Sequence, residues 1–329
     1  MMAHTESDEP AERIAVLIPC YNEEKTVTQV IGNFRHFLPG AEIYVYDNNS
    51  KDQTASLAIE AGAIVRLERR QGKGNVLRRM FSDIEADIYV LVDGDDTYDA
   101  ASAPGMITKL LTNSLDMVVG TRLTTFDETA FRPGHEWGNK ILTGFVSLLF
   151  GREITDMLSG YRIFSRRFVK SFPALSKGFE TETELTVHAL ELRMPVAEVV
   201  TPYGMRPTGS ESKLRTYRDG FRILKTIINL FKEERPLIFF SLLFAMLALI
   251  SVILVIPIFI TYVETGQVPR FPTAILSTGI MILAFLSLAC GFILDMVTLG
   301  RRELKRLSYL SIPAPGSTSI IYTVQTPRR

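Results

Sequence analysis

The chain has 329 residues, and its 36 lysines and arginines balance 36 aspartates and glutamates. Zero net charge excludes the broad basic field typical of nucleic-acid-binding domains, so nucleic acid is not expected as a partner. The two cysteines, Cys20 and Cys290, stand far apart in the sequence, which argues against a disulfide framework. The polar N-terminus (residues 1–12) lacks the apolar core of a signal peptide, so we expect the first domain to stay on the side where it is synthesised.

Apolar, β-branched runs alternate with segments of helical spacing through the first part of the chain. The expected strands are 13–19, 42–47, 63–67, 88–92 and 117–119, and the expected helices are 23–38, 52–61, 75–84 and 103–113. Short apolar runs without alternation are typical of strands that are buried on both faces. Strands separated by helices join through right-handed crossovers. The sequence therefore predicts an α/β domain with a mainly parallel sheet and helices on both faces.

Polar turns follow four of these strands. They are residues 19–24 (PCYNEE), 47–50 (DNNS), 71–74 (QGKG) and 93–96 (DGDD). In an open parallel sheet such turns share one edge, which is where ligands bind. Gly94 lets the backbone turn closely, so Asp93 and Asp95 can share a divalent cation. Mg²⁺ or Mn²⁺ prefers such oxygen ligands and bridges to a diphosphate, although an acidic turn by itself also suits a helix cap or a solvated loop.

Together these turns resemble glycosyltransferase family 2, whose nucleotide-binding fold is called GT-A, over about residues 13–213. The resemblance implies a nucleotide-sugar donor and a divalent metal ion. The donor-side residues that it implies are Pro19, Tyr21, Glu23, Asp47, Lys73, Asp93, Gly94, Arg206 and Lys213. Three of them have simpler alternatives: Asp47 suits a turn, Glu23 suits a helix N-terminus, and Lys73 suits a flexible loop.

The second half of the domain narrows the resemblance. Residues 156–162 (DMLSGYR) resemble the acceptor-side motif of polyprenyl-phosphate glycosyltransferases, and residues 179–182 and 206–214 also match that group. The group includes dolichyl-phosphate mannose synthases and the bacterial undecaprenyl-phosphate glucosyltransferases of O-antigen modification. The implied acceptor-binding residues are Arg122, Arg132, Asn139, Arg162 and Ser212, and the implied catalytic residues are Asp156, Asp95, Arg122 and Arg132.

The chemistry of a phosphate acceptor explains the arginines. Arg122 and Arg132 can bind phosphate oxygens through directional, charge-assisted hydrogen bonds, with surface ion pairs as the alternative. The resemblance makes Asp156 the candidate base of an inverting displacement at the anomeric carbon. A lipid phosphate has a second pKa of about 6 and needs little deprotonation, so Asp156 has the alternative role of orienting Arg162 or a sugar hydroxyl. Glu182 is a further candidate, with a buried structural ion pair as its alternative.

The C-terminal part has the pattern of a membrane anchor. Residues 216–235 combine apolar residues at helical spacing with basic flanks and are expected to form an amphipathic helix at the bilayer surface, with core packing as the alternative. Residues 237–263 and 273–294 contain no charge, and each exceeds the roughly 20 residues that cross a hydrocarbon core. Basic residues follow the second span, whereas the connecting loop holds only Arg270. The positive-inside rule therefore places both ends of the hairpin in the cytoplasm.

We expect five parts: a disordered N-terminus (1–12), a GT-A catalytic domain (13–215), a juxtamembrane helix (216–235), a transmembrane hairpin (236–298, with spans 237–263 and 273–297) and a basic tail (299–329). The expected activity is metal-dependent sugar transfer from a nucleotide sugar to polyprenyl phosphate, for envelope glycan modification. By resemblance, a UDP-sugar is favoured as donor and a tetramer as the oligomer. The expected location is a bacterial inner membrane.

Three other functions stay in view. The acceptor of the same transfer chemistry can be another lipid or a soluble molecule. A non-catalytic membrane protein that binds nucleotide sugars would share the donor motifs. Processive polysaccharide synthases resemble one another in a Gln-x-x-Arg-Trp sequence. The only tryptophan here, Trp137, does not lie in such a sequence, so a synthase is disfavoured.

Overall fold

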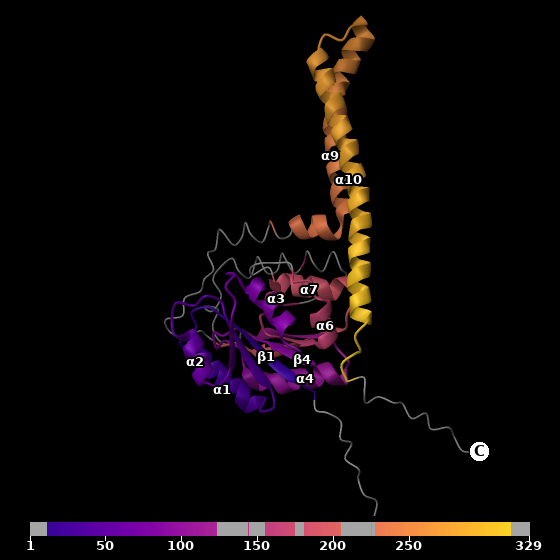
Figure 1. The fold of residues 1–329 in the computed structure, drawn as a ribbon. Coiled ribbons are helices and arrows are strands. Elements are labelled where there is room, and N and C mark those ends of the chain that lie inside the picture. The colour runs from indigo at the N-terminus through magenta and orange to yellow at the C-terminus, as the bar shows by residue number, and fades with distance from the viewer. Residues whose placement is uncertain are drawn as a thin grey trace, which may run out of the picture. The chain divides into compact units, whose positions relative to one another are not determined.

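The structure is a computed structural model that describes residues 12–123, 144, 155–174, 181–204, 225 and 228–316. The chain divides into two compact units. One comprises Met1–Asp219 together with Lys305–Arg329, and the other comprises Gly220–Leu304. The first unit contains a sheet with helices on both faces, and the second contains most of two long helices (Figure 1).

The first unit is built on a 7-stranded sheet with the order β3-β2-β1-β4-β6-β5-β7. Its strands are β1 (Ile14–Cys20), β2 (Glu42–Asp47), β3 (Ile64–Leu67), β4 (Ile88–Leu91), β5 (Met117–Leu123), β6 (Arg162–Ser165) and β7 (Val196–Pro202). Only β6 is antiparallel to its neighbours, β4 and β5. The predicted mainly parallel sheet is confirmed. The sequence did not indicate β6 or β7: β6 begins at Arg162, inside the polar motif of residues 156–162, and β7 carries a charged residue, Glu198.

Two groups of helices cover the two faces of the sheet. One face carries α1 (Val27–Phe37), α2 (Thr54–Glu60), the 3₁₀ helix η1 (Ala100–Ser102) and α4 (Ala103–Thr112), and the other carries α3 (Lys73–Asp83), α6 (Arg166–Ser171) and α7 (Thr181–Glu191). Strand β1 shows that both faces of the sheet are buried against apolar side chains. Val16 and Ile18 belong to one core, and Ala15 and Leu17 belong to the other. The run without alternation is therefore the sequence signature of this buried strand.

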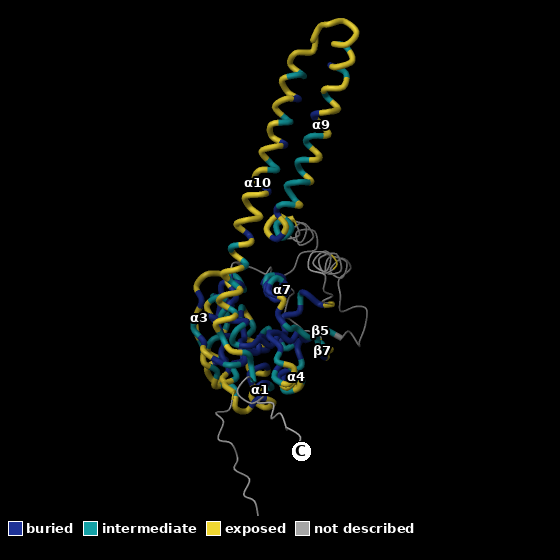
Figure 2. Tube along the Cα trace, turned by 90° about the vertical axis from the view of Figure 1, so that its right-hand side faces the viewer, coloured by how far each residue is buried: buried dark blue, intermediate teal, exposed yellow. Residues whose placement is uncertain are grey.

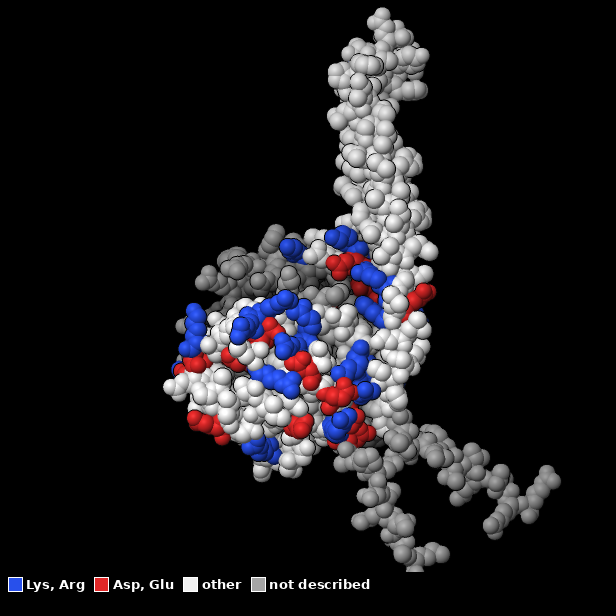
Figure 3. Space-filling view, in the orientation of Figure 1, with Lys and Arg blue, Asp and Glu red and all other residues white. Residues whose placement is uncertain are grey.

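The second unit is dominated by α9 (Pro236–Thr265) and by α10 (Phe271–Leu310) as far as Leu304. Both helices are long and apolar enough to cross a membrane, judged by length and composition. Most of their side chains are exposed (Figure 2). In the face shown in Figure 3, the charged side chains of the pair gather toward one end and the rest is uncharged. So much exposed apolar surface suits a bilayer as the solvent.

Small residues hold the two helices together. Ser277, Ala284 and Gly291 are buried at every second turn of α10. The Ser251 hydroxyl donates to the Ser277 carbonyl oxygen at 2.8 Å. A Cβ atom at residue 291 would lie 2.9 Å from Cβ of Phe240, so a larger residue would push the helices apart. Close packing of this kind is how helices associate in lipid, where no hydrophobic driving force acts between them.

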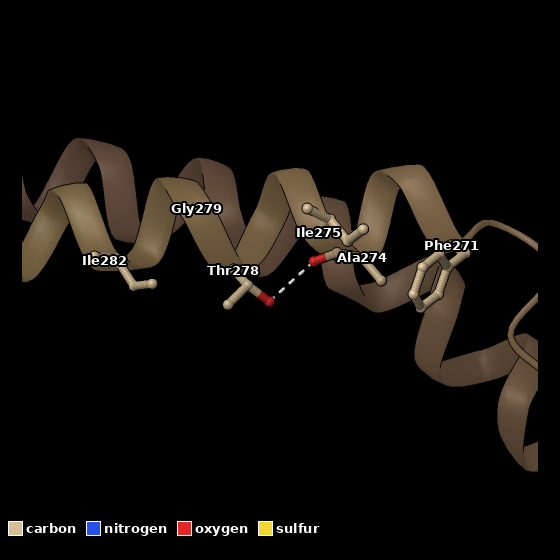
Figure 4. A pocket seen from close by; sticks show the side chains of 6 residues that line it. All are labelled: Phe271, Ala274, Ile275, Thr278, Gly279 and Ile282. Carbon is tan, nitrogen blue, oxygen red and sulfur yellow. Dashed lines mark hydrogen bonds between the residues drawn. The ribbon is translucent and has the colours of Figure 1, made fainter.

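An apolar groove lies on α10 next to the connection between the helices (Figure 4). Its lining residues are Phe271, Ala274, Ile275, Thr278, Gly279 and Ile282. The only side-chain hydroxyl, on Thr278, donates to the Ala274 carbonyl oxygen of its own helix at 2.9 Å. The groove therefore offers apolar surface and no free polar side chain for a ligand.

The predicted helix over 216–235 lies mostly outside the described residues; residues 225 and 228–234 are helical. Helix α10 continues to Leu310, beyond the expected end of the span at 297. Residues from Lys305 onward belong to the first unit. The expected basic tail (299–329) thus begins inside α10, and its residues from Lys305 onward are part of the first unit.

Candidate active site

A lysine whose side chain is 12% exposed joins two carboxylates at the carboxyl end of β4. Lys73, the first residue of α3, places its Nζ 2.6 Å from Oδ1 of Asp93 and 2.6 Å from Oε1 of Glu182. Burial disfavours the charged lysine, but the two carboxylates outweigh it and raise the pKa of Lys73 above its ordinary value. Among the described residues, no hydrogen-bond partner contacts the other oxygen of Glu182, the buried Oε2. Lys73 is therefore a fixed cation and not a flexible loop residue, and Glu182 has one acceptor atom to spare.

The two aspartates of the acidic turn differ in environment. The Asp93 side chain is 30% exposed, whereas Asp95 is 4% exposed and accepts from the Thr97 hydroxyl at 2.6 Å. Between them, a Cβ atom at Gly94 would lie 2.7 Å from Sγ of Cys20. Glycine is thus required at this position by the end of β1, which presses against the turn.

These carboxylates fit a divalent cation only together with a ligand. Among the described residues, no group of three or more His, Cys, Asp or Glu side chains is gathered as a preformed metal site. Asp93 and Asp95 supply two oxygen donors. Mg²⁺ and Mn²⁺ are commonly held by one or two carboxylates plus substrate phosphate oxygens and water, so this donor set suits a cation that arrives with a diphosphate.

Asp156 and Arg122 form a bidentate pair. Nε and Nη2 of Arg122 donate to the two Asp156 oxygens, each at 2.7 Å, and the guanidinium lies 5.6 Å from the ring centre of Tyr203. Burial alone would raise the pKa of Asp156, but the hydrogen bonds and charge of Arg122 outweigh it and hold that pKa below its ordinary value. An ionised carboxylate with both oxygens engaged is a weak base. The alternative of an Asp156–Arg162 pair is replaced here by Asp156–Arg122.

Arg162 lies beneath the turn of residues 156–160. It is completely buried and donates to the carbonyl oxygens of Met157 at 2.6 Å and Ser159 at 2.9 Å, and to the Thr186 hydroxyl at 2.8 Å. Burial lowers its pKa. Arg162 therefore supports the turn from below, and the predicted direct contact with an acceptor does not fit this position.

The turn and the acidic motif touch each other. A Cβ atom at Gly160 would overlap the Asp93 carboxylate, so the backbone of the turn lies directly against it. The Gly160 amide donates to the Tyr98 hydroxyl at 2.9 Å, and the Ser159 hydroxyl donates to the Gly120 carbonyl oxygen at 2.6 Å. The donor-side carboxylate and the element that carries Asp156 thus form one packed site.

The remaining donor-side residues lie at the ends of β1 and β2. Asp47 is buried, and its oxygens accept from the Ser50 amide at 3.3 Å, as in a turn. The carbonyl oxygen of Glu23 accepts from the amide of Val27 at 3.0 Å, at the start of α1. The Asp47 contacts fit a turn, whereas the Glu23 contact is made by the backbone and does not test its side chain. The nucleotide-binding roles of Pro19, Tyr21, Glu23 and Asp47 stay predictions.

Asn48 is a residue that the sequence analysis did not single out. Its amide nitrogen donates to the carbonyl oxygens of Glu68 and Arg70, each at 2.8 Å, and its oxygen accepts from the Gly72 amide at 2.7 Å. It therefore ties the turn after β2 to the loop that carries Lys73. The sequence feature that could have indicated it is the pair of asparagines in residues 47–50.

The predicted residues Arg132, Asn139, Arg206, Ser212 and Lys213 lie outside the described part of the chain.

Comparison with known proteins identifies the family. The family model for glycosyl transferase family 2 matches residues 15–172. The chain is 60% identical to uncharacterized protein SF2094/S2216 of Shigella flexneri over 47% of this chain and 95% of that protein. It is 34% identical to glycosyltransferase AglJ of Haloferax volcanii over 70% of this chain and 76% of that protein. The chain belongs to glycosyl transferase family 2.

Further similarities agree with the assignment to glycosyl transferase family 2. The chain is 28% identical to a dolichyl-phosphate hexose transferase of Haloferax volcanii over 68% of this chain and 95% of that protein. Its fold is similar to the crystal structure of glucosyl-3-phosphoglycerate synthase from Mycobacterium tuberculosis in complex with Mn²⁺, UDP and phosphoglyceric acid. That similarity has a TM-score of 0.55 at 24% identity and covers 68% of this chain and 78% of that one. The predicted GT-A fold and glycosyltransferase activity are confirmed.

Proposed function

We propose that this glycosyltransferase moves a sugar from a nucleotide sugar to a polyprenyl phosphate, with inversion at the anomeric carbon. The contact between Gly160 and Asp93 carries the proposal. It joins a carboxylate pair suited to a donor diphosphate and its cation to the turn whose Asp156 holds Arg122, a cation suited to an acceptor phosphate. The name of the dolichyl-phosphate hexose transferase relative supports the same acceptor chemistry.

The apolar helices favour an acceptor that resides in a bilayer. Their exposed aliphatic side chains suit lipid, and a polyprenyl chain would share that solvent. The chain segments before and after the helix pair, Met1–Asp219 and Lys305–Arg329, belong to the same compact unit. Both ends of the pair therefore belong on one side of the membrane. The basic residues after α10 favour the cytoplasmic face of a bacterial inner membrane.

In the proposed mechanism the chain positions two anions. Asp93 and Asp95 would hold Mg²⁺ or Mn²⁺, which supplies charge stabilisation to the departing nucleoside diphosphate. Lys73 and Glu182 fix Asp93 in place. Arg122 binds the acceptor phosphate, and Asp156 orients Arg122. The phosphate, whose second pKa is about 6, is itself the nucleophile and needs no protein base.

Residues outside the described part keep their predicted roles in this proposal. Arg132, Asn139 and Ser212 are assigned to the acceptor, and Arg206 and Lys213 to the donor. A UDP-sugar is the proposed donor, and a tetramer is the proposed assembly.

The deciding experiment measures transfer to undecaprenyl phosphate. The full chain in detergent micelles is supplied with a panel of radiolabelled nucleotide sugars, with Mn²⁺, with Mg²⁺ or with EDTA. One donor should give a lipid-linked product that EDTA abolishes. Asp95→Asn should slow transfer by roughly 100-fold or more, because the cation loses a ligand. The matched control is Asp87→Asn: Asp87 precedes the same strand and pairs with the exposed Arg13, so its loss should leave transfer within about twofold.

The outcomes separate the alternatives. Transfer to 3-phosphoglycerate but not to the lipid would replace the polyprenyl acceptor with a soluble phosphorylated one. Donor binding without transfer to any acceptor would favour a nucleotide-sugar-binding protein. Full activity of Asp95→Asn would contradict the metal assignment.

A further inference from the structure

The end of α10 packs onto the catalytic fold. Lys305 and Tyr309 stand one helical turn apart on the same face of the helix. Nζ of Lys305 lies 2.6 Å from Oε2 of Glu191, and the Tyr309 hydroxyl donates to Oδ2 of Asp116 at 2.8 Å. All four residues belong to the first compact unit. We call residues 305–316, which follow the second apolar helix segment, the strap.

The strap completes a buried polar cluster. The side chain of Asp116 is fully buried and also accepts from the Ser165 hydroxyl at 2.7 Å and from Arg167 Nη2 at 2.8 Å. The Arg167 guanidinium stacks over the Tyr309 ring, 4.7 Å from its centre. The ring also packs against the apolar core that underlies α3, α6 and α7. Because a buried carboxylate is tolerated only when its oxygens are satisfied, this attachment is specific.

Helix α7 connects the strap to the active site. Its last residue, Glu191, has a side chain that is only 3% exposed and pairs with Lys305. Its second residue, Glu182, pairs with Lys73 beside Asp93. Between them, Thr186 accepts from Arg162, which supports the turn that carries Asp156. One short helix therefore contacts the strap, the acidic motif and the support of the Arg122–Asp156 pair.

We propose that Lys305 and Tyr309 are positioning residues of the active site, acting through α7. A shift of α7 would withdraw Glu182 from Lys73 and would leave this lysine with Asp93 as its single carboxylate. The same shift would loosen Thr186 from Arg162. The strap continues directly from the second apolar helix, so one continuous helix carries both an anchor and a brace for the catalytic helix. Only the activity measurement below rests on the proposed function.

The test uses the full chain in detergent micelles and the double variant Lys305→Met/Tyr309→Phe. Hydrogen–deuterium exchange is followed in peptides that cover 181–191, with peptides that cover 14–20 as an internal reference. Exchange in 181–191 should accelerate by about 10-fold while the reference is unchanged, because α7 loses its ion pair with Lys305 and the strap loses its hydrogen bond to Asp116. The kcat for sugar transfer should fall by roughly 10-fold, less than the roughly 100-fold loss for a misplaced catalytic group, because the strap acts on the site only through α7. Arg306→Met is the matched control, since it removes the same charge from the exposed neighbouring position and should change neither measurement.

A charge reversal distinguishes positioning from a general loss of stability. Glu191→Lys alone should disturb α7 exchange, and Lys305→Glu added to it should restore both exchange and kcat. Unchanged α7 exchange in Lys305→Met/Tyr309→Phe, or an equal effect of Arg306→Met, would overturn the proposal. If Lys305→Met/Tyr309→Phe does not fold, Lys305→Met alone, which removes the contact with Glu191 and keeps Tyr309 on Asp116, gives the same two readouts. If the wild-type chain transfers no sugar, the proposed function fails, and the exchange data decide on the strap by themselves.

Discussion

Asp156 shows how a neighbouring cation sets the role of a carboxylate. In sequence it occupies the position of a catalytic base, but its two oxygens both accept from Arg122. A base must accept a proton during the reaction, and the arginine lowers the pKa of Asp156 and so weakens its proton affinity. The same pair gives Arg122 a fixed direction. Orientation of Arg122, the proposed phosphate-binding cation, is therefore the role that the geometry favours.

This role predicts a distinctive pH profile. The transfer rate should rise with pH up to about 6, where the acceptor phosphate loses its second proton. Asp156→Asn should lower the plateau, because Arg122 loses its partner, and should leave the position of the acidic limb unchanged. A pH–rate profile of wild type and variant checks this. If the limb shifts or disappears in Asp156→Asn, Asp156 is the base after all.

His188 predicts a pH dependence of stability. It is buried on α7 against Phe168 and Phe172, and burial, helped by the charge of Lys305, lowers its pKa to about 3. The unfolded chain has a histidine pKa of about 6.5 and so binds a proton that the folded chain rejects. The free energy of unfolding should therefore fall as the pH drops below about 6.5, by at most about 1.4 kcal/mol per pH unit until the pH reaches the folded value.

Urea unfolding of the full chain at pH 7 and pH 5 measures this slope. His188→Leu, which has no titrating group, should lose less stability than wild type over this interval. Equal losses in the two proteins would show that His188 is not the group responsible.

At the scale of elements, the meeting of the 156–160 turn with the acidic motif depends on one missing side chain. Gly160→Ala would place a methyl group against the Asp93 carboxylate and displace it. We expect transfer to fall by about 100-fold, the loss typical of a misplaced catalytic group, while the fold persists. Gly105→Ala in α4 is the control, since nothing lies within 4 Å of the added atom, and it should change the free energy of unfolding by no more than about 1 kcal/mol, in the stabilising direction. The transfer rate and the urea midpoint of each variant are the measurements, and an active Gly160→Ala would refute this geometry.

The elements also show which parts of a fold a sequence reveals. The first five strands and the helices between them were predicted because each is a local pattern, apolar without alternation in the strands and periodic in the helices. Strand β6 pairs antiparallel between β4 and β5, and its four residues include the buried Arg162. A charged residue in a short segment does not indicate a strand, and its burial depends on partners that only the fold provides.

At the scale of the whole molecule, the proposed topology can be tested by labelling. In a Cys290→Ser background, Gln267→Cys in the connection between α9 and α10 should react with a membrane-impermeant maleimide added to intact spheroplasts. Ser311→Cys in the strap and Lys51→Cys near the donor side should react only after the membrane is permeabilised. This outcome follows from the shared unit of strap and sheet and from the positive-inside rule. Labelling of Ser311→Cys and Lys51→Cys on opposite sides would contradict it.

The sequence by itself determined the parallel sheet, the acidic turn at its edge and the two apolar helices. Each of these is written in neighbouring residues, and parallel strands necessarily bring their carboxyl ends to one edge. Only the tertiary structure decided what the charged side chains do. Arg122 and Asp156 are separated by 34 positions, and Tyr309 and Asp116 by 193. Whether such a group is free, paired or buried depends on the atoms that folding brings beside it, since electrostatic and hydrogen-bond energies act through space and not along the chain.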